Sequence, residues 1–419
     1  MFKRMIKSLW QGILQKLRKD RRIFCISAGF SLVIIVFSYM FGNTQHSLPG
    51  DNAALTEIYY AGKFLGNKIE NVPDSLLLIN VCYDKQLVPF EEDGMPVGDM
   101  VITDREKLLR FLTIAKEADN YRYIFLDINF EEGYDSPSDS ALFQTIKTMD
   151  RIVIPNHSGI RMKDSSLYAK SANADYSITW KVRVFSRFQY LRNDTVVTVP
   201  LKIYSERIGA DGCAIKQHLG GLWYSDNGRL CHNGVTLLMR MIVNGRYIDG
   251  DESQSREYSY SYLGSDLLDV DDVFPVKDQL ADKIIVIGDF SSDRHSTYLG
   301  AQPGSVVCMN AYLALMAGDH LVNWFNVLLL FLIYTVVGTF YLQGNSFSSL
   351  FKNPWLSVLM SFLSTATLFF VISLIANYYE IVFNIWVPTT VYSLIDTYVQ
   401  KRKLYKTRKN EKNSNPVVA

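Results

Sequence analysis

The sequence predicts an extracytoplasmic α/β domain, with a mostly parallel sheet and an inserted β-hairpin, carried by four transmembrane helices. Hydrophobic runs lie near both ends of the 419-residue chain, and the long middle alternates short apolar runs with amphipathic segments. About 20 apolar residues in a helix cross the hydrocarbon core of a bilayer. Four runs have this character, namely Ile23–Phe41, Trp324–Leu342, Trp355–Ala376 and, less cleanly, Ile381–Val399.

The distribution of charge predicts the orientation of the chain. Eight Lys and Arg residues precede residue 43 and eight follow residue 322, whereas the stretch between holds 27 basic and 38 acidic residues. Lys and Arg beside a span stay in the cytoplasm. We therefore expect both termini in the cytoplasm and the middle outside. The expected segments are a leader (1–22), four spans (23–41, 323–342, 355–376 and 381–399), the outer domain (42–322) and a basic tail (400–419).

The leader has apolar residues at helical spacing among its Lys and Arg residues. This pattern favours a basic amphipathic helix on the membrane surface, and a polar leader with chance periodicity is the alternative. No small-residue cleavage site follows Ile23–Phe41, so we expect a retained signal anchor.

Short apolar runs bounded by polar residues predict the strands of the sheet. These runs are Ser75–Val81, Tyr123–Ile128, Arg151–Pro155 and Lys283–Ile287. A helix is expected to begin after Thr103, an N-cap with Glu106 at the capping-box position. Further helices are expected at Ser138–Met149, Leu201–Ile208 and Val307–Ala317. The β-α-β-α-β order predicts parallel strands covered by helices.

Other segments are rich in β-branched and aromatic residues. Tyr176–Tyr190 and Thr195–Val199 are expected to form one long hairpin, and Glu257–Leu263 a further strand. The glycine-rich stretch Gly209–Asn233 has only a weak pattern.

The five cysteines leave two questions open. Cys213 and Cys231 flank the glycine-rich turns and would be able to form a disulfide in an oxidising compartment, which spacing alone cannot decide. His218 and His232 lie near them, but the spacing matches no common zinc pattern, so we expect no metal. Cys82 and Cys308 are expected to be buried as small apolar residues.

Several segments together resemble the class-two CHASE domain, an extracellular sensory domain of bacterial transmembrane receptors. The likeness rests on the opening strand Leu76–Val81, the Arg-headed helix start at Asp104–Leu108, the strand end Phe125–Phe130, the final strand Ile285–Gly288, and Pro303-Gly304 before the helix Met309–Gly318. It extends over roughly residues 50–400 and includes the three spans after the domain. The resemblance implies a sensory domain outside the inner membrane of a bacterium.

The chain departs from this family in three places. Met100–Thr103 lacks the usual Trp-Pro, and Cys308 stands where the family pattern has His. The family's last span normally leads to an output domain, whereas only Gln400–Ala419 follows here, too short to bury a core. We expect this tail to be a positive-inside anchor, with docking to an acidic partner or lipid as the alternative.

Ligands of open α/β sheets bind beyond the carboxyl ends of the strands. Polar residues follow three strands of the expected sheet, and Arg105 heads a helix beside them. The candidate ligand-binding residues are Asn80, Arg105, Asp127, Asn129, Glu131, Asp289, Asp293, Arg294 and His295. Such an acidic pocket would suit a divalent or organic cation or a polyhydroxyl ligand.

Structural roles are the alternative for these residues. Asp127 is as readily interpreted as a helix cap or as the partner of Arg105 in a buried ion pair. Asp289 and Asp293 would then be ordinary loop acids, and His295 a solvated loop residue in place of a pH sensor. Asp396, near the inner end of the fourth run, is either a functional intramembrane carboxylate or one that reaches water.

No enzyme motif is present in the sequence, and the acidic outer domain disfavours nucleic-acid binding, so we expect neither catalysis nor a cofactor. The leading hypothesis is a sensory or receptor protein that signals through its spans to a separate partner protein. The alternatives are a scaffold subunit of an envelope complex and, much weaker, an envelope enzyme using Asp127.

Overall fold

The computed structural model describes residues 21–44, 55–57, 59–60, 73–92, 95–175, 184–193, 195–237, 239–243, 260–269, 276–345, 353–378 and 385–414. The chain divides into two units. One is Asn43–Leu321, and the other combines Met1–Gly42 with Val322–Ala419. The expected leader helix therefore lies outside the described residues for nearly all of its length.

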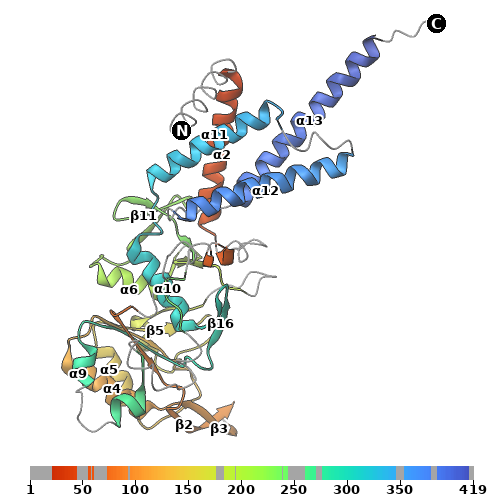
Figure 1. The fold of residues 1–419 in the computed structure, drawn as a ribbon. Helices are drawn as coiled ribbons and strands as arrows, with labels where there is room; N and C mark the ends of the chain where they lie inside the picture. Colours follow the sequence, from red (N-terminus) through yellow and green to blue (C-terminus); the bar gives the residue numbers. More distant parts are fainter. Residues whose placement is uncertain are drawn as a thin grey trace. The chain divides into compact units, whose positions relative to one another are not determined.

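Six parallel strands form the central sheet of the unit Asn43–Leu321 (Figure 1). Their order is β14 (Tyr260–Tyr262), β1 (Leu76–Asn80), β15 (Ile284–Gly288), β4 (Tyr123–Asp127), β5 (Ile152–Asn156) and β6 (Ser171–Asn173). The parallel sheet predicted from the apolar runs is confirmed. The last strand of this sheet in the sequence, β15, lies between β1 and β4, so the order of the strands reverses at this point.

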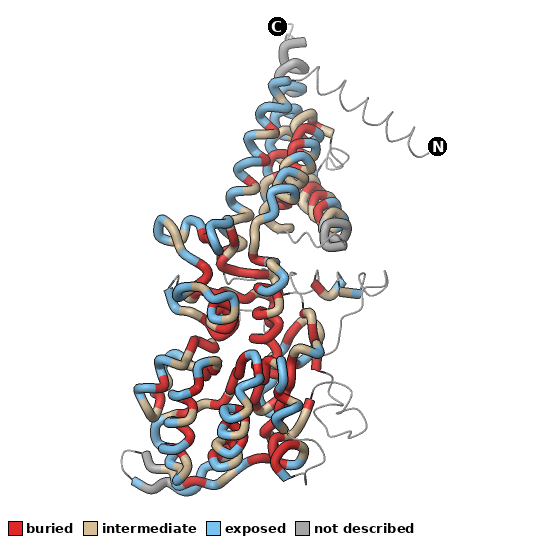
Figure 2. Tube along the Cα trace, turned by 90° about the vertical axis from the view of Figure 1, so that its left-hand side faces the viewer, coloured by how far each residue is buried: buried red, intermediate tan, exposed pale blue. Residues whose placement is uncertain are grey.

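Helices cover both faces of the sheet. The two-residue alternation of a strand puts Ile124 and Leu126 of β4 on one face and Phe125 on the other. The first face packs against α4 (Arg105–Ala118), α5 (Asp139–Thr148), α9 (Val276–Leu280), the 3₁₀ helix η1 (Ser165–Lys170) and the π-helix η2 (Leu263–Leu268). The second packs against α6 (Val199–Arg207) and α10 (Gly304–Ala317). In Figure 2 the buried residues are concentrated in the interior of this unit, and the exposed residues lie at its periphery.

The expected long hairpin is wrong in its pairing. In the described part, β7 (Arg187–Gln189) pairs with β13 (Gly234–Thr236), which is distant in sequence. Only β8 (Leu191–Arg192) and β9 (Val196–Val197) pair locally. The chain then enters α6 at Val199, so no residues remain for a longer second strand. Residues 176–183 lie outside the described part.

Three antiparallel features have no counterpart in the sequence-based expectations. β2 (Lys85–Glu92) pairs with β3 (Met95–Thr103), and β16 (Arg294–Thr297) pairs with β17 (Gly300–Pro303). β10 (Ile215–His218), β11 (Trp223–Asp226) and β12 (Arg229–Cys231) form a small sheet within the weakly patterned stretch. Because Thr103 pairs with Lys85 in β3, the cap of α4 is Asp104, whose side chain accepts from the backbone N–H groups of Glu106 and Lys107.

None of the five cysteines is in a disulfide, so the structure does not link Cys213 to Cys231. Cys231 is buried in the core and Cys213 is half-buried. Cys308 is buried as expected, whereas Cys82 is only half-buried. Among the described residues, no three His, Cys, Asp or Glu side chains are grouped to hold a metal ion.

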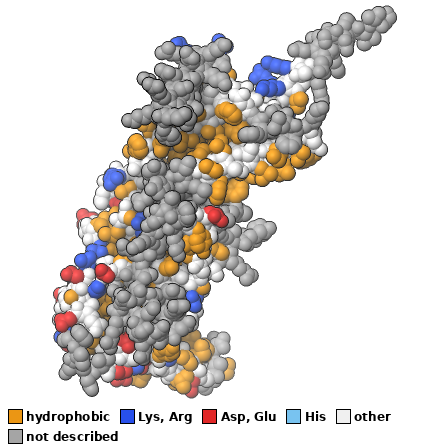
Figure 3. Space-filling view, in the orientation of Figure 1, with side chains coloured by type: hydrophobic (Ala, Val, Ile, Leu, Met, Phe, Trp, Pro, Cys, Tyr) orange, Lys and Arg blue, Asp and Glu red, His pale blue; other side chains and the backbone are white. Residues whose placement is uncertain are grey.

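In the described part of the other unit, three helices are long and apolar enough to cross a membrane, in α2 (Arg21–Gly42), α11 (Trp324–Leu342) and α12 (Pro354–Tyr378). Hydrophobic side chains cover much of their visible surface (Figure 3). The fourth predicted span is not confirmed. Residues 381–384 lie outside the described part, and α13 (Trp386–Ser414) runs without a break from an apolar start into the basic tail.

Small and polar residues line the contacts between these four helices. Ser27 of α2 donates a hydrogen bond to the Thr335 carbonyl of α11 (2.8 Å). Gly338 permits this approach, because a methyl group there would overlap Ser27 Oγ. Asp396 of α13 is fully buried and accepts a hydrogen bond from Ser361 of α12 (2.5 Å). The carboxylate therefore does not reach water, which excludes one of the two alternatives for Asp396. A functional carboxylate within the membrane is the alternative that remains.

Candidate functional site

The carboxyl edge of the sheet carries acidic side chains on the face that α10 covers. Asp127 ends β4 and lies in register with Gly288, the last residue of β15. Asp289 and Asp293 follow β15 directly, and His295 lies on β16. The edge therefore brings together the acidic residues that were predicted from the sequence, at the position where the strand order changes.

Asp127 is the most perturbed carboxyl group at this edge. Burial raises its pKa to about 8, and the negative charge of Asp293 adds to the increase. Within the described part of the chain, no hydrogen bond or ion pair is made by the Asp127 carboxylate. A carboxylate with neither a cation nor a donor beside it favours the protonated form.

Asp293 lies against the start of α10. Its carboxylate is 2.8 Å from His295 Nε2, and its carbonyl accepts from the backbone N–H of Gly304 (3.0 Å). A methyl group at Gly304 would lie 2.5 Å from Asp293 Oδ2, so the close approach needs glycine. Although the Asp293 side chain is 50% exposed, partial desolvation raises its pKa, while the nearby His157 opposes the increase. Burial also lowers the pKa of His295, so this histidine is expected to be neutral near pH 7.

Asp289 differs from these two residues because it has a cationic partner. Lys85 of β2 lies 2.7 Å from Asp289 Oδ2, and the backbone N–H groups of Ser291 and Ser292 donate to Oδ1. These contacts hold the pKa of Asp289 below its usual value, despite the opposing effect of burial. Asp289 is therefore an ionised loop residue that joins the β2–β3 hairpin to the edge of the sheet.

Asn80 has a structural role. It is completely buried at the end of β1 and donates to the Tyr260 hydroxyl of the neighbouring strand (2.8 Å). Its side-chain oxygen accepts from the backbone N–H groups of Cys82 (3.0 Å) and Phe290 (3.2 Å). Both polar ends of the amide are thus used in shaping the loops after β1 and β15.

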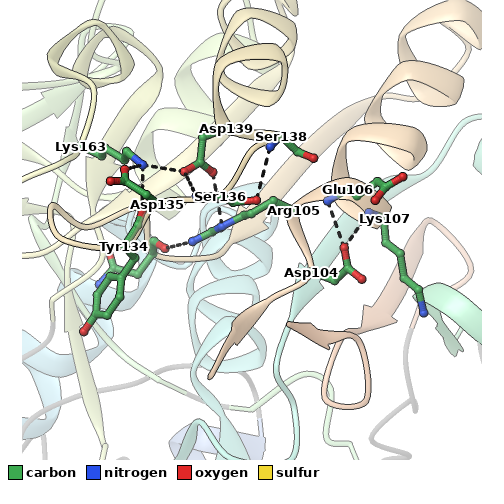
Figure 4. A network of polar contacts seen from close by, with 11 residues as sticks. Asp104, Arg105, Glu106, Lys107, Tyr134, Asp135, Ser136, Ser138, Asp139 and Lys163 are labelled. Carbon is green, nitrogen blue, oxygen red and sulfur yellow. Dashed lines mark hydrogen bonds and ion pairs between the residues drawn. The ribbon is translucent and has the colours of Figure 1, made fainter. Parts of the chain in front are cut away.

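Arg105 lies on the opposite face of the sheet, which makes its expected pairing with Asp127 wrong. Asp127 follows the alternation of Phe125 and faces α10, whereas Arg105 begins α4 on the other side. The partner of Arg105 is Asp139, at the start of α5 (Figure 4).

The cluster around Arg105 is buried and structural. The guanidinium group lies 4.3 Å from the centre of the Phe130 ring and donates to the Asn129 carbonyl (3.0 Å). Its Nε is 3.9 Å from Asp139, whose second oxygen binds Lys163 (2.8 Å). Burial lowers the pKa of Arg105 to about 10, so the group stays charged near pH 7.

The remaining candidates are not directed at the acidic edge. The Asn129 side chain donates to Glu131 within the same loop. Arg294 is exposed and donates to the Ala301 carbonyl of β17 (2.9 Å). These three residues hold loops together, and their positions do not connect them with Asp127.

Other residues near the edge were missed. His157 follows β5, its Nδ1 lies 2.9 Å from the Asp175 carboxylate, and it is close enough to Asp293 to oppose the increase in that residue's pKa. Cys308 is buried in α10; this burial raises the pKa of its thiol, and the charges of Asp127 and Asp293 add to the increase. The rule that ligands bind beyond strand ends would have found His157. No local pattern marks Cys308.

Two adjacent carboxyl groups of raised pKa can exchange a proton near neutral pH or bind a cation that offsets their charge.

Comparisons with protein-family models, curated proteins and solved structures give no match to the chain. The likeness to the class-two CHASE family stays a prediction, and the site is interpreted from its own geometry.

Proposed function

We propose that this chain is a sensory receptor of the bacterial inner membrane, with four spans, both termini in the cytoplasm and the unit Asn43–Leu321 outside. Its ligand is a proton or a small organic cation held by Asp127 and Asp293. The observation that carries the proposal is the half-buried Asp127 carboxylate at the switch point of the sheet, whose surroundings raise its pKa to about 8.

Comparison with other carboxylates of the same unit supports a binding role. Asp139 is buried beside Lys163 and Arg105, and Asp84 is buried beside Lys107 (2.7 Å). Structural carboxylates in this unit thus have cationic partners, as expected for buried charges. A bound cation would provide Asp127 with the positive charge that Lys163 provides for Asp139 and Lys107 provides for Asp84.

A continuous segment connects the site to the membrane. The helix α10 begins at Gly304 beside Asp293 and ends at Ala317, and α11 begins at Trp324. Between them, His320 is fully buried, and its Nε2 lies 2.9 Å from Asp226, which also accepts from Tyr204 (2.8 Å). We infer that ligand binding shifts α10 and, through this anchored connection, the span and its separate cytoplasmic partner.

Thermal unfolding of the full-length protein in lipid nanodiscs tests the proposal. The probes are putrescine, spermidine, choline, Ca²⁺ and Mg²⁺ at fixed pH and ionic strength. We expect an organic cation to raise the melting temperature of the wild type but not that of Asp127→Asn or Asp293→Asn. Asp278→Asn, an exposed acid on α9, is the control and should respond as the wild type does.

Two results would contradict a receptor role for this site. One is an equal response of all four proteins to the cation. The other is no response to any cation, together with a pH dependence of stability in Asp127→Asn that equals that of the wild type.

A scaffold role is the second candidate, because the β2–β3 hairpin exposes apolar side chains. Leu87 and Val101 face each other across the two strands and are 68% and 62% exposed. A protein partner that binds here should co-purify with the wild type and be lost from Leu87→Ser/Val101→Ser. Loss of the partner without any ligand effect would favour the scaffold.

A further inference from the structure

The turn between β10 and β11 exposes large apolar side chains on a well-defined tip. Leu219 is 77% exposed, Leu222 is 55% exposed and Trp223 is 37% exposed. Most exposed apolar residues of a soluble surface are scattered singly, so three within five residues call for an explanation.

The tip is rigid. Gly220 and Gly221 both have positive φ, and the Gly221 N–H donates to the His218 carbonyl (3.2 Å), which closes the turn. Trp223 lies in register with His218 across the strands, and the two rings stack with centres 3.7 Å apart. The apolar side chains are therefore presented on a preformed support.

The hydrogen-bonded rows place this tip close to the chain's entry into the membrane. Tyr224, next to Trp223, pairs with Cys231 of β12, and Cys231 pairs in turn with Leu321. Neighbouring strands lie about 4.8 Å apart, so the row from Tyr224 to Leu321 spans about 10 Å. The chain from Leu321 to Trp324, the first residue of α11, spans about 10 Å at most.

We propose that the segment Leu219–Trp223 inserts into the lipid leaflet on the side of the outer domain. Leucine and tryptophan are the residues that anchor proteins at the boundary between headgroups and acyl chains, with the indole N–H left in the polar layer. Lys216 projects from the same face of β10 as His218 and is exposed, which suits anionic headgroups. This anchor is independent of the Asp127 site.

The bilayer is favoured over a protein partner because connectivity alone keeps the tip near a membrane-entering helix. The segment Leu219–Trp223 thereby gives the outer unit a second attachment besides its covalent links. It would limit rotation of that unit about the start of α11.

Tryptophan quenching in full-length protein tests the anchor. The protein is placed in nanodiscs of lipids with or without brominated acyl chains, and the emission of Trp223→Phe is subtracted from that of the wild type. We expect the Trp223 emission to be blue-shifted and to fall to less than half in brominated lipid. In Leu219→Ser/Leu222→Ser, the quenching by bromine should be largely lost.

Leu87→Ser, which removes an equally exposed leucine from the β2–β3 hairpin, is the matched control and should leave the quenching unchanged. Two results would overturn the proposal. One is a Trp223 emission that is indifferent to brominated lipid but quenched by iodide in water. The other is an emission indifferent to both quenchers, which would mean that a protein surface, from a partner or a second copy, covers the tip.

Discussion

Asp127 shows how the environment of one residue decides its chemistry. The sequence placed a carboxylate after a buried strand, and its role depended on which groups surround it. In the fold it faces Asp293 and the start of α10, with no cation beside it among the described residues. The same side chain on the other face would have met Arg105.

The pH dependence of stability follows from the raised pKa of Asp127. Unfolded Asp titrates near pH 4, and folded Asp127 titrates at about 8. Between these values the folded state binds more protons, so the free energy of unfolding falls as pH rises, by up to about 1.4 kcal/mol per pH unit. We expect Asp127→Asn to be about as stable as the wild type at or below about pH 4 and increasingly more stable as the pH rises to about 9.

Differential scanning calorimetry across this pH range measures the effect, with Asp278→Asn as the control. A variant that unfolds at lower temperature than the wild type at every pH would show that the carboxylate is structural.

At the scale of elements, the buried polar cluster ties α4 to α5. Asp139 interacts with both Arg105 and Lys163, so Asp139→Ala leaves two cations without their shared carboxylate. We expect a loss of about 3–5 kcal/mol in the free energy of unfolding, as for other broken buried pairs. Glu117→Ala, which removes the exposed partner of Lys277, should cost less than about 1 kcal/mol.

Denaturant unfolding that follows the tryptophan signal of the outer unit gives both values. Similar losses in the two variants would mean that the Arg105 cluster adds little to stability.

Helix contacts in the membrane unit depend on small residues. A larger side chain at Gly338 would overlap Ser27 and approach Tyr392, so Gly338→Ile should separate α2 from α11. Val336→Ile, at a position 41% exposed on the same helix, is the control and should be tolerated. A disulfide between Ser27→Cys and Thr335→Cys, formed with mild oxidant, reports the contact. Equal yields in the two backgrounds would argue against this packing.

For the whole molecule, the fourth span decides the topology. If α13 and the residues before it cross the membrane, both termini lie in the cytoplasm. We expect a green fluorescent protein fused after residue 419 to fluoresce, and alkaline phosphatase inserted at the exposed turn of Gly159 to be active. If green fluorescent protein fused after residue 419 does not fluoresce, and alkaline phosphatase fused at the same position is active, then the C-terminus lies outside and the chain has only three spans.

Much of the architecture was predictable because its signals are local. Leu76–Asn80 and Ile284–Gly288 are continuous apolar runs, and such runs become buried parallel strands whatever surrounds them. The hairpin Lys85–Thr103 was missed because Leu87 and Val101 are exposed, which blurs the alternation that marks a half-buried strand. The pairing of Arg187–Gln189 with Gly234–Thr236 joins distant segments, which local patterns do not specify.

The sequence by itself determined the hydrophobic runs, the basic ends, the parallel sheet and the gathering of acidic residues at one sheet edge. Only the tertiary structure decided the partners of those residues. Strand register and the helices packed on each face separate Asp127 from Arg105, and they bring Asp293 and Cys308 near Asp127. The reason is physical: a strand's apolar character depends on its own residues, whereas the charge and burial of a side chain depend on neighbours that are far away in the chain.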